Sequence, residues 1–158
     1  MSNRLARVLL SMVQFVGVAA FLVAEGIQLA GPGFTDRSLT INAITYLLGV
    51  NGIVAGCGHL FFPDPVADAI GWARGTPWQW EVGLGDLAYG IPGVMAGSYG
   101  QGFWLATIIA ASVFLIGAAV GHVRQLISAH NFSPGNAGPI LFTDVLMPVV
   151  AIVAYARL

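Results

Sequence analysis

Apolar residues fall into five long segments separated by short polar connections. The segments cover about residues 5–30, 39–62, 77–99, 103–129 and 139–157. An α-helix rises about 1.5 Å per residue, so roughly 20 apolar residues cross the hydrocarbon core of a bilayer. The pattern therefore predicts an all-α integral membrane protein, in which residues 1–158 form a single domain, a bundle of five transmembrane helices.

The connections carry helix-start and turn signals. Thr76, Pro77 and Gln79 have the spacing of an N-cap, a first-turn proline and a capping-box partner, which starts the third span near Pro77. Asp64 before Pro65 predicts a short interfacial helix at about residues 64–73. Residues 131–138 are rich in Asn, Ser, Pro and Gly and predict a turn-rich loop.

Composition supports a membrane protein and argues against nucleic-acid binding, an intramolecular disulfide and a zinc site of clustered thiolates. The chain is 57% hydrophobic and 8% charged, with a mean hydropathy of +0.82. It contains no Lys and has a net charge of −1, which leaves no basic surface for nucleic acid. Cys57 is the only cysteine, so neither an intramolecular disulfide nor a zinc site of clustered thiolates can form.

The arginines predict the orientation in an inner (plasma) membrane. With five spans and a cytoplasmic N-terminus, four arginines fall inside and two outside, as the positive-inside rule favours. The inner ones are Arg4, Arg7, Arg74 and Arg124, and the outer ones are Arg37 and Arg157. Both longer connections then lie on the cytoplasmic side.

Glycines at helical spacing predict the contact faces of the second and third spans. In lipid, small residues let helices approach closely, because the hydrophobic effect does not press helices together there. Steps of three or four residues place glycines on one face of each span. These predicted packing residues are Gly49, Gly52, Gly56, Gly90, Gly93 and Gly97.

Four ionisable residues lie inside the predicted spans at a similar depth. Counting from the cytoplasmic interface places His59, Asp86, His122 and Asp144 within roughly 10 Å of one level. Ionisable groups in a membrane are usually paired or functional. In one interpretation each His donates to an Asp and the pairs only fix helix register. In a second, the four residues form a metal or proton site, with Glu81 at its rim.

A third interpretation is a b-type haem held by His59 and His122. A porphyrin can approach a helix backbone closely only where side chains are absent. Glycines flank both histidines, namely Gly56, Gly58, Gly117 and Gly121. Asp86 and Asp144 argue against haem, because its faces need apolar cover. The cofactor therefore stays open between none, a metal ion and a b-type haem.

Several separated motifs occur in a characteristic order. They are Asn51-Gly52 to Gly58-His59, Phe62-Pro63-Asp64, Ile70-Gly71-Trp72, Thr76-Pro77-Trp78-Gln79 with Glu81-Val82-Gly83, Gly121-His122, and Asn131 to Gly138. Over about residues 50–150 the chain resembles a family of small bacterial multi-pass membrane proteins of unknown function. The resemblance implies a helical membrane fold and brings no activity with it.

The leading functional hypothesis is an accessory or interaction subunit of a larger membrane complex. The chain has almost no mass outside the predicted spans and has more glycine-rich faces than five short helices need for their own packing. The expected partners are the lipid bilayer and other membrane subunits, or further copies of the chain. The alternative is a redox or transport site built on the two His and two Asp residues near the cytoplasmic face.

Overall fold

The structure is a computed structural model, and it describes residues 15–158. Within this range all the regular secondary structure is helical. No strand occurs in that range. The elements are α2 (Val16–Leu29), α3 (Asp36–Asn42), the π-helix η1 (Ala43–Val50), α4 (Asn51–Phe61), α5 (Pro63–Ile70), α6 (Trp78–Val94), the short 3₁₀-helix η2 (Ala96–Ser98), α7 (Gln101–Ser128), α8 (Pro134–Ala137) and α9 (Pro139–Tyr155).

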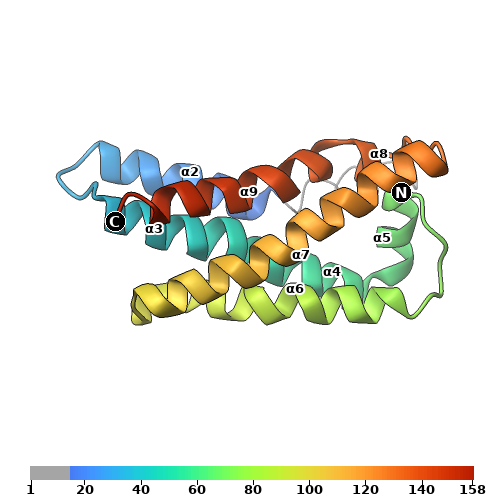
Figure 1. Cartoon of the computed structure of the whole chain (residues 1–158), viewed down its shortest axis with the longest axis horizontal. Helices are drawn as coiled ribbons and strands as arrows, with labels where there is room; N and C mark the ends of the chain where they lie inside the picture. The colour runs from blue at the N-terminus through green and yellow to red at the C-terminus, as the bar shows by residue number, and fades with distance from the viewer. Residues whose placement is uncertain (1–14) are drawn as a thin grey trace.

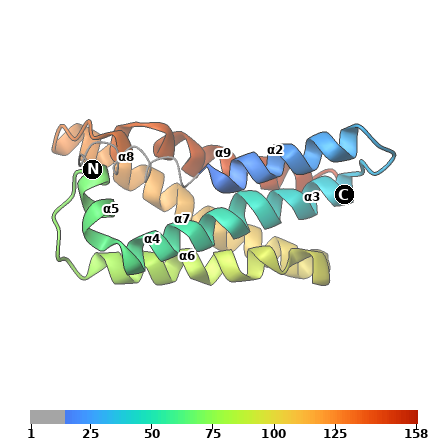
Figure 2. The same ribbon diagram turned by 180° about the vertical axis from the view of Figure 1, so that it is seen from behind.

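Most of the long helices run along the long axis of an elongated bundle, and α7 (Gln101–Ser128) crosses it obliquely (Figure 1). The short helices α5 and α8 sit together at one end, and the α2–α3 connection and the C-terminus lie at the other (Figure 1). Seen from behind, α4 and α6 run next to each other, and α5 lies at the end of the bundle where α4 finishes and α6 begins (Figure 2).

The second predicted span is one continuous helix made of α3, η1 and α4, Asp36–Phe61. It starts at a capping box, where Thr35 Oγ1 accepts a hydrogen bond from Ser38 N at 3.0 Å and Ser38 Oγ accepts one from Thr35 N at 2.9 Å. The π-helical middle widens the turn, and such segments are frequent at functional sites. Here the segment ends directly before Asn51, which faces the cavity described below.

Three helices of the described range, not the five predicted, are long and apolar enough to cross a membrane. They are Asp36–Phe61, Gln101–Ser128 and Pro134–Tyr155. The first predicted span lies partly outside the described residues, and its described part, α2, has 14 residues. The third, α6, has 17 residues, because it starts at Trp78, as predicted, but ends at Val94 rather than near residue 99.

Close contact between η1–α4 and α6 depends on glycines, which have no side chain to hold the two helices apart. A Cβ atom added to Gly93 would lie 2.5 Å from Gly49 Cα, and one on Gly90 would lie 2.9 Å from Gly52 C. One on Gly56 would lie 2.8 Å from Gly83 O. These helices therefore pack backbone to backbone, as the glycine spacing predicts.

Gly97 does not belong to this contact. The helix α6 ends at Val94, so Gly97 falls in η2, where an added Cβ would meet only Ile41 Cγ2 at 4.0 Å. The spacing argument fails at this residue because it assumes that the helix continues.

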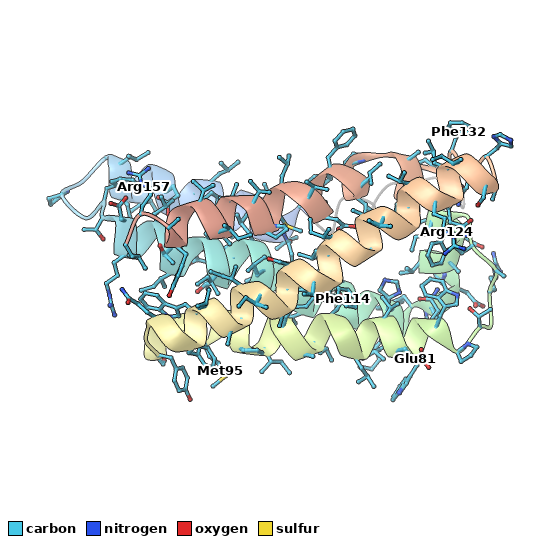
Figure 3. The ribbon with its side chains drawn as sticks, in the orientation of Figure 1. Glu81, Met95, Phe114, Arg124, Phe132 and Arg157 are labelled. Atoms are coloured by element: carbon cyan, nitrogen blue, oxygen red, sulfur yellow. The ribbon has the colours of Figure 1, made fainter. Side chains whose placement is uncertain are left out.

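Polar contacts at the two ends of the bundle agree with the predicted grouping of arginines. Arg157 Nε lies 2.8 Å from Asp36 Oδ1, and the Arg37 guanidinium lies 4.9 Å from the centre of the Trp104 ring. At the other end, Arg74 pairs with Asp68, which raises the pKa of Arg74. Figure 3 shows Arg124 and Arg157 at opposite ends of the bundle. Arg4 and Arg7 lie outside the described residues.

Candidate functional site

A cavity of about 610 Å³ opens among five helices near the end that carries α5 and α8. Its walls come from α4, α5, α6, α7 and α9, together with Trp72 in the connection before α6. Most of the lining is apolar, and polar groups come from a small set: Asn51, His59, Trp72, Trp78, Asp86, Tyr89, His122, Thr143 and Asp144. All four ionisable residues that the sequence singles out therefore face one cavity.

The hydrogen bonds of Gln79 fix the tautomer of His59. Gln79 Nε2 donates to the carbonyl oxygen of Pro63 at 3.0 Å, so its Oε1 faces His59 Nδ1, 2.5 Å away. An amide oxygen only accepts, so Nδ1 must carry the proton. The other ring nitrogen, Nε2, then bears a lone pair, and it has no hydrogen-bond partner among the described residues.

Asn136 does the same for His122. Asn136 Nδ2 donates to the carbonyl oxygens of Asn131 at 2.9 Å and of His122 itself at 3.2 Å. Its Oδ1 therefore accepts the proton of His122 Nδ1, at 2.8 Å. Asn136 is completely buried, so water does not compete for these bonds.

Both imidazoles thus present Nε2 as an acceptor, each held in place by a side-chain amide. Histidines that bind a metal or a ligand through one nitrogen usually have the other nitrogen fixed by a hydrogen bond of this kind. The arrangement orients two basic nitrogens at the wall of an apolar cavity.

The two aspartates have different surroundings. Asp86 Oδ1 accepts a hydrogen bond from Tyr89 Oη at 2.8 Å. Asp144 Oδ2 lies 3.7 Å from His122 Nε2, too far for a hydrogen bond, and no described residue donates to its carboxyl group. Of the two predicted His–Asp pairs, the structure brings together His122 and Asp144, whereas His59 bonds Gln79 instead.

The described residues do not gather a metal-binding cluster. No group of three His, Cys, Asp or Glu side chains in residues 15–158 lies close enough to hold an ion. Glu81 is exposed on α6 and is absent from the cavity wall (Figure 3). The prediction that Glu81 joins the other four is wrong, because it lies more than one helical turn from Asp86 and on another side of α6.

Aromatic rings form one side of the cavity. Trp72 lies between Trp78 and His122, with ring centres 4.8 Å and 6.0 Å apart, and Trp78 contacts the His59 ring at 5.6 Å. Trp72 Nε1 is buried and has no hydrogen-bond partner in the described part of the chain. A buried donor without a partner at a cavity wall is a place for a ligand atom or a water.

Glycines leave part of the α7 wall open. Gly117 and Gly121 of α7 line the cavity, and a Cβ added to either would meet no atom within 4 Å. Gly58 also lines it, whereas Gly56 packs against α6 and is not part of the wall. A ligand can therefore approach the backbone of α7 directly.

Sequence reasoning missed Gln79 and Asn136. Gln79 was expected to close a capping box with Thr76, but Pro77 is the N-cap of α6 and no side chain caps it. Asn136 lies in the predicted loop 131–138, of which residues 134–137 form the helix α8. Likewise α5 begins at Pro63 without the predicted Asp64 cap. In the sequence, each residue is a side-chain amide within one of the connecting motifs, and this was the feature that could have indicated a hydrogen-bonding role.

Comparisons with known proteins identify the family. No curated protein and no solved structure matches the chain. A match to one family extends over residues 4–158, which is more of the chain than the motifs named above. The chain belongs to the family of unknown function DUF6790.

Proposed function

We propose that this protein is an integral membrane protein that binds a small, largely apolar molecule in the cavity between α4, α5, α6, α7 and α9. The observation that carries the proposal is that two oriented imidazoles and two carboxyl groups share one mostly apolar cavity of about 610 Å³. Ligand sites combine these features: predominantly apolar walls, a few convergent polar groups and a volume of roughly 300–1,000 Å³.

A binding test can use alkylbenzenes as probes of the apolar walls. Two of the four tryptophans, Trp72 and Trp78, line the cavity, so occupancy changes the tryptophan emission. Titration of the purified protein with butylbenzene is expected to give a saturable change. Gly121→Leu places a side chain in the cavity where an added Cβ meets no atom, and is expected to weaken binding at least tenfold.

The matched control is Gly26→Leu. Gly26 is an exposed helical glycine of α2, outside the cavity wall, and an added Cβ there also meets no atom within 4 Å. This variant is expected to bind butylbenzene like the wild type. Equal affinity in the wild type and in Gly121→Leu, or no saturable signal, would overturn the proposal.

A b-type haem is a second candidate for the same cavity. It is favoured by the free Nε2 atoms of His59 and His122 and by the open backbone at Gly117 and Gly121. Protein purified from membranes of cells supplied with haem precursor would then show a Soret band that His59→Ala and His122→Ala each abolish. Absence of the band in the folded wild-type protein would reject haem.

The five-span topology is part of this proposal. Gly56 of α4 meets Gly83 of α6, and Gly49 meets Gly93, so α6 runs antiparallel to the Asp36–Phe61 span over most of its depth. Seventeen residues extend about 25 Å. A helix that follows a membrane span over that distance crosses most of the same bilayer.

The accessory-subunit role stays a prediction. It is supported by exposed apolar side chains on the outer faces of α7 and α9, which either lipid or another membrane subunit can cover. These residues are Val113, Val120, Ile127, Phe142, Leu146 and Val153. Chemical crosslinking in native membranes tests it, and a chain that crosslinks to nothing contradicts it.

A further inference from the structure

The cavity wall carries two carboxyl groups, those of Asp86 and Asp144, and no Lys or Arg among the described residues. Only 10% of the Asp144 side chain is exposed, and the nearest basic nitrogen, His122 Nε2, is 3.7 Å away. An ionised carboxylate in an apolar site is costly unless a cation compensates it. A positively charged ligand would supply that compensation.

The hydrogen-bonding groups of the wall are also unbalanced. Several of its donors are engaged within the protein: Tyr89 Oη bonds Asp86, Thr143 Oγ1 bonds the Ile140 carbonyl oxygen, and Asn51 Nδ2 contacts Met147 Sδ. Trp72 Nε1 is a donor without a partner in the described part of the chain. Free acceptors remain on both His Nε2 atoms and on the Asp144 carboxyl group. The complementary ligand is therefore mainly a hydrogen-bond donor.

Aromatic rings also belong to the cavity wall that carries these acceptors. Trp72 lies beside His122, and Tyr89 packs against Phe114 with ring centres 5.6 Å apart. All of these side chains line the cavity. Aromatic faces attract cations through their quadrupole, and the attraction is stronger where water is excluded.

We propose that the ligand is a lipophilic organic cation, with its ammonium group beside Asp144 and His122 and its apolar body along the aromatic wall and the open face of α7. This inference rests on the proposed function, since it names the class of molecule that the cavity accepts. Positive charge, N–H donors and an apolar body together match the carboxyl groups, the imidazole acceptors and the cavity walls.

The test uses two probes of the same shape. Protonated 3-phenylpropylamine and butylbenzene differ only in an ammonium group in place of a terminal methyl group. Tryptophan emission of the purified full chain is expected to show that the ammonium probe binds at least tenfold more tightly than butylbenzene, after each is corrected for its partition into detergent micelles.

Asp144→Asn keeps the size of the side chain and removes its charge. We expect it to weaken binding of the ammonium probe at least tenfold more than it weakens binding of butylbenzene. The control is Asp64→Asn, because Asp64 is an exposed carboxylate outside the cavity. Saturable butylbenzene binding by Asp144→Asn also shows that this variant folds.

The outcomes separate the two proposals. If butylbenzene binds and the ammonium probe binds no better, or if Asp144→Asn leaves the affinity for the ammonium probe unchanged, the cation inference is overturned and the cavity site stands. If 1,4-dihydroxynaphthalene binds more tightly than the ammonium probe and His59→Phe removes that preference, the ligand is a neutral donor instead. If no probe binds the wild type saturably, both proposals fail.

Discussion

Hydrogen bonds to two amide side chains decide what the histidines can do. Free imidazole exchanges its proton between two nitrogens, but Gln79 and Asn136 accept only from Nδ1 because their own N–H groups donate to carbonyl oxygens. His59 and His122 could be picked out from the sequence as ionisable groups within apolar segments. Their partners could not, because the amides lie 20 and 14 residues away along the chain.

Replacing Gln79 with Leu is expected to release the His59 tautomer. Gln79 is only 4% exposed, so its loss leaves the Pro63 carbonyl and His59 Nδ1 without their partner. The expected cost is about 1–3 kcal/mol of unfolding free energy. Nitrogen-15 NMR of the ring should show Nδ1–H alone in the wild type and a mixture of tautomers in the variant.

Gln101→Leu is the control for that substitution. Gln101 is exposed at the first position of α7, and its side chain makes no hydrogen bond to a described residue. Its stability and its histidine spectrum should match the wild type. A His59 ring that keeps a single Nδ1–H tautomer in Gln79→Leu would contradict the assigned role of Gln79.

At the scale of the helices, glycines set the distance between η1–α4 and α6. The spacing of small residues predicts this contact because only local periodicity is needed to find a helix face. The end of α6 at Val94 depends on where the chain turns back, so the same reasoning included Gly97 wrongly. The π-helix η1 also has no signal in the apolar pattern.

Gly93→Ala is expected to destabilise the bundle. The new Cβ would lie 2.5 Å from Gly49 Cα and 2.7 Å from Gly49 N, and backbone atoms cannot move aside as a side chain can. Separating the helices should cost about 1–3 kcal/mol. Thermal unfolding in detergent measures the change. Gly26→Ala, where nothing lies within 4 Å, should not lower stability, and equal melting of both variants would contradict backbone contact.

For the whole molecule, the prediction that matters is which connections share a side of the membrane. The five-span topology places the α2–α3 and α6–α7 connections together outside and the α5–α6 connection inside. Exposed residues in these connections allow single cysteines at Gly33, Gly100 and Ala73, in a Cys57→Ser background.

An impermeant maleimide added to sealed right-side-out vesicles is expected to label Gly33→Cys and Gly100→Cys. Ala73→Cys should react only after the membrane is permeabilised. The result for Gly100 tests α6 itself, because a helix that does not cross would leave residues 73 and 100 on the same side. Labelling of Ala73→Cys and Gly100→Cys together would therefore exclude the five-span topology.

The sequence by itself determined the helical class, the apolar segments and most of the glycine contact, because each depends on composition or on the period of one helix. Only the tertiary structure decided that His59, Asp86, His122 and Asp144 line one cavity while Glu81 does not, and that Gln79 and Asn136 orient the imidazoles. These features require helices distant in sequence to meet at a given rotation and depth, and no local pattern specifies that.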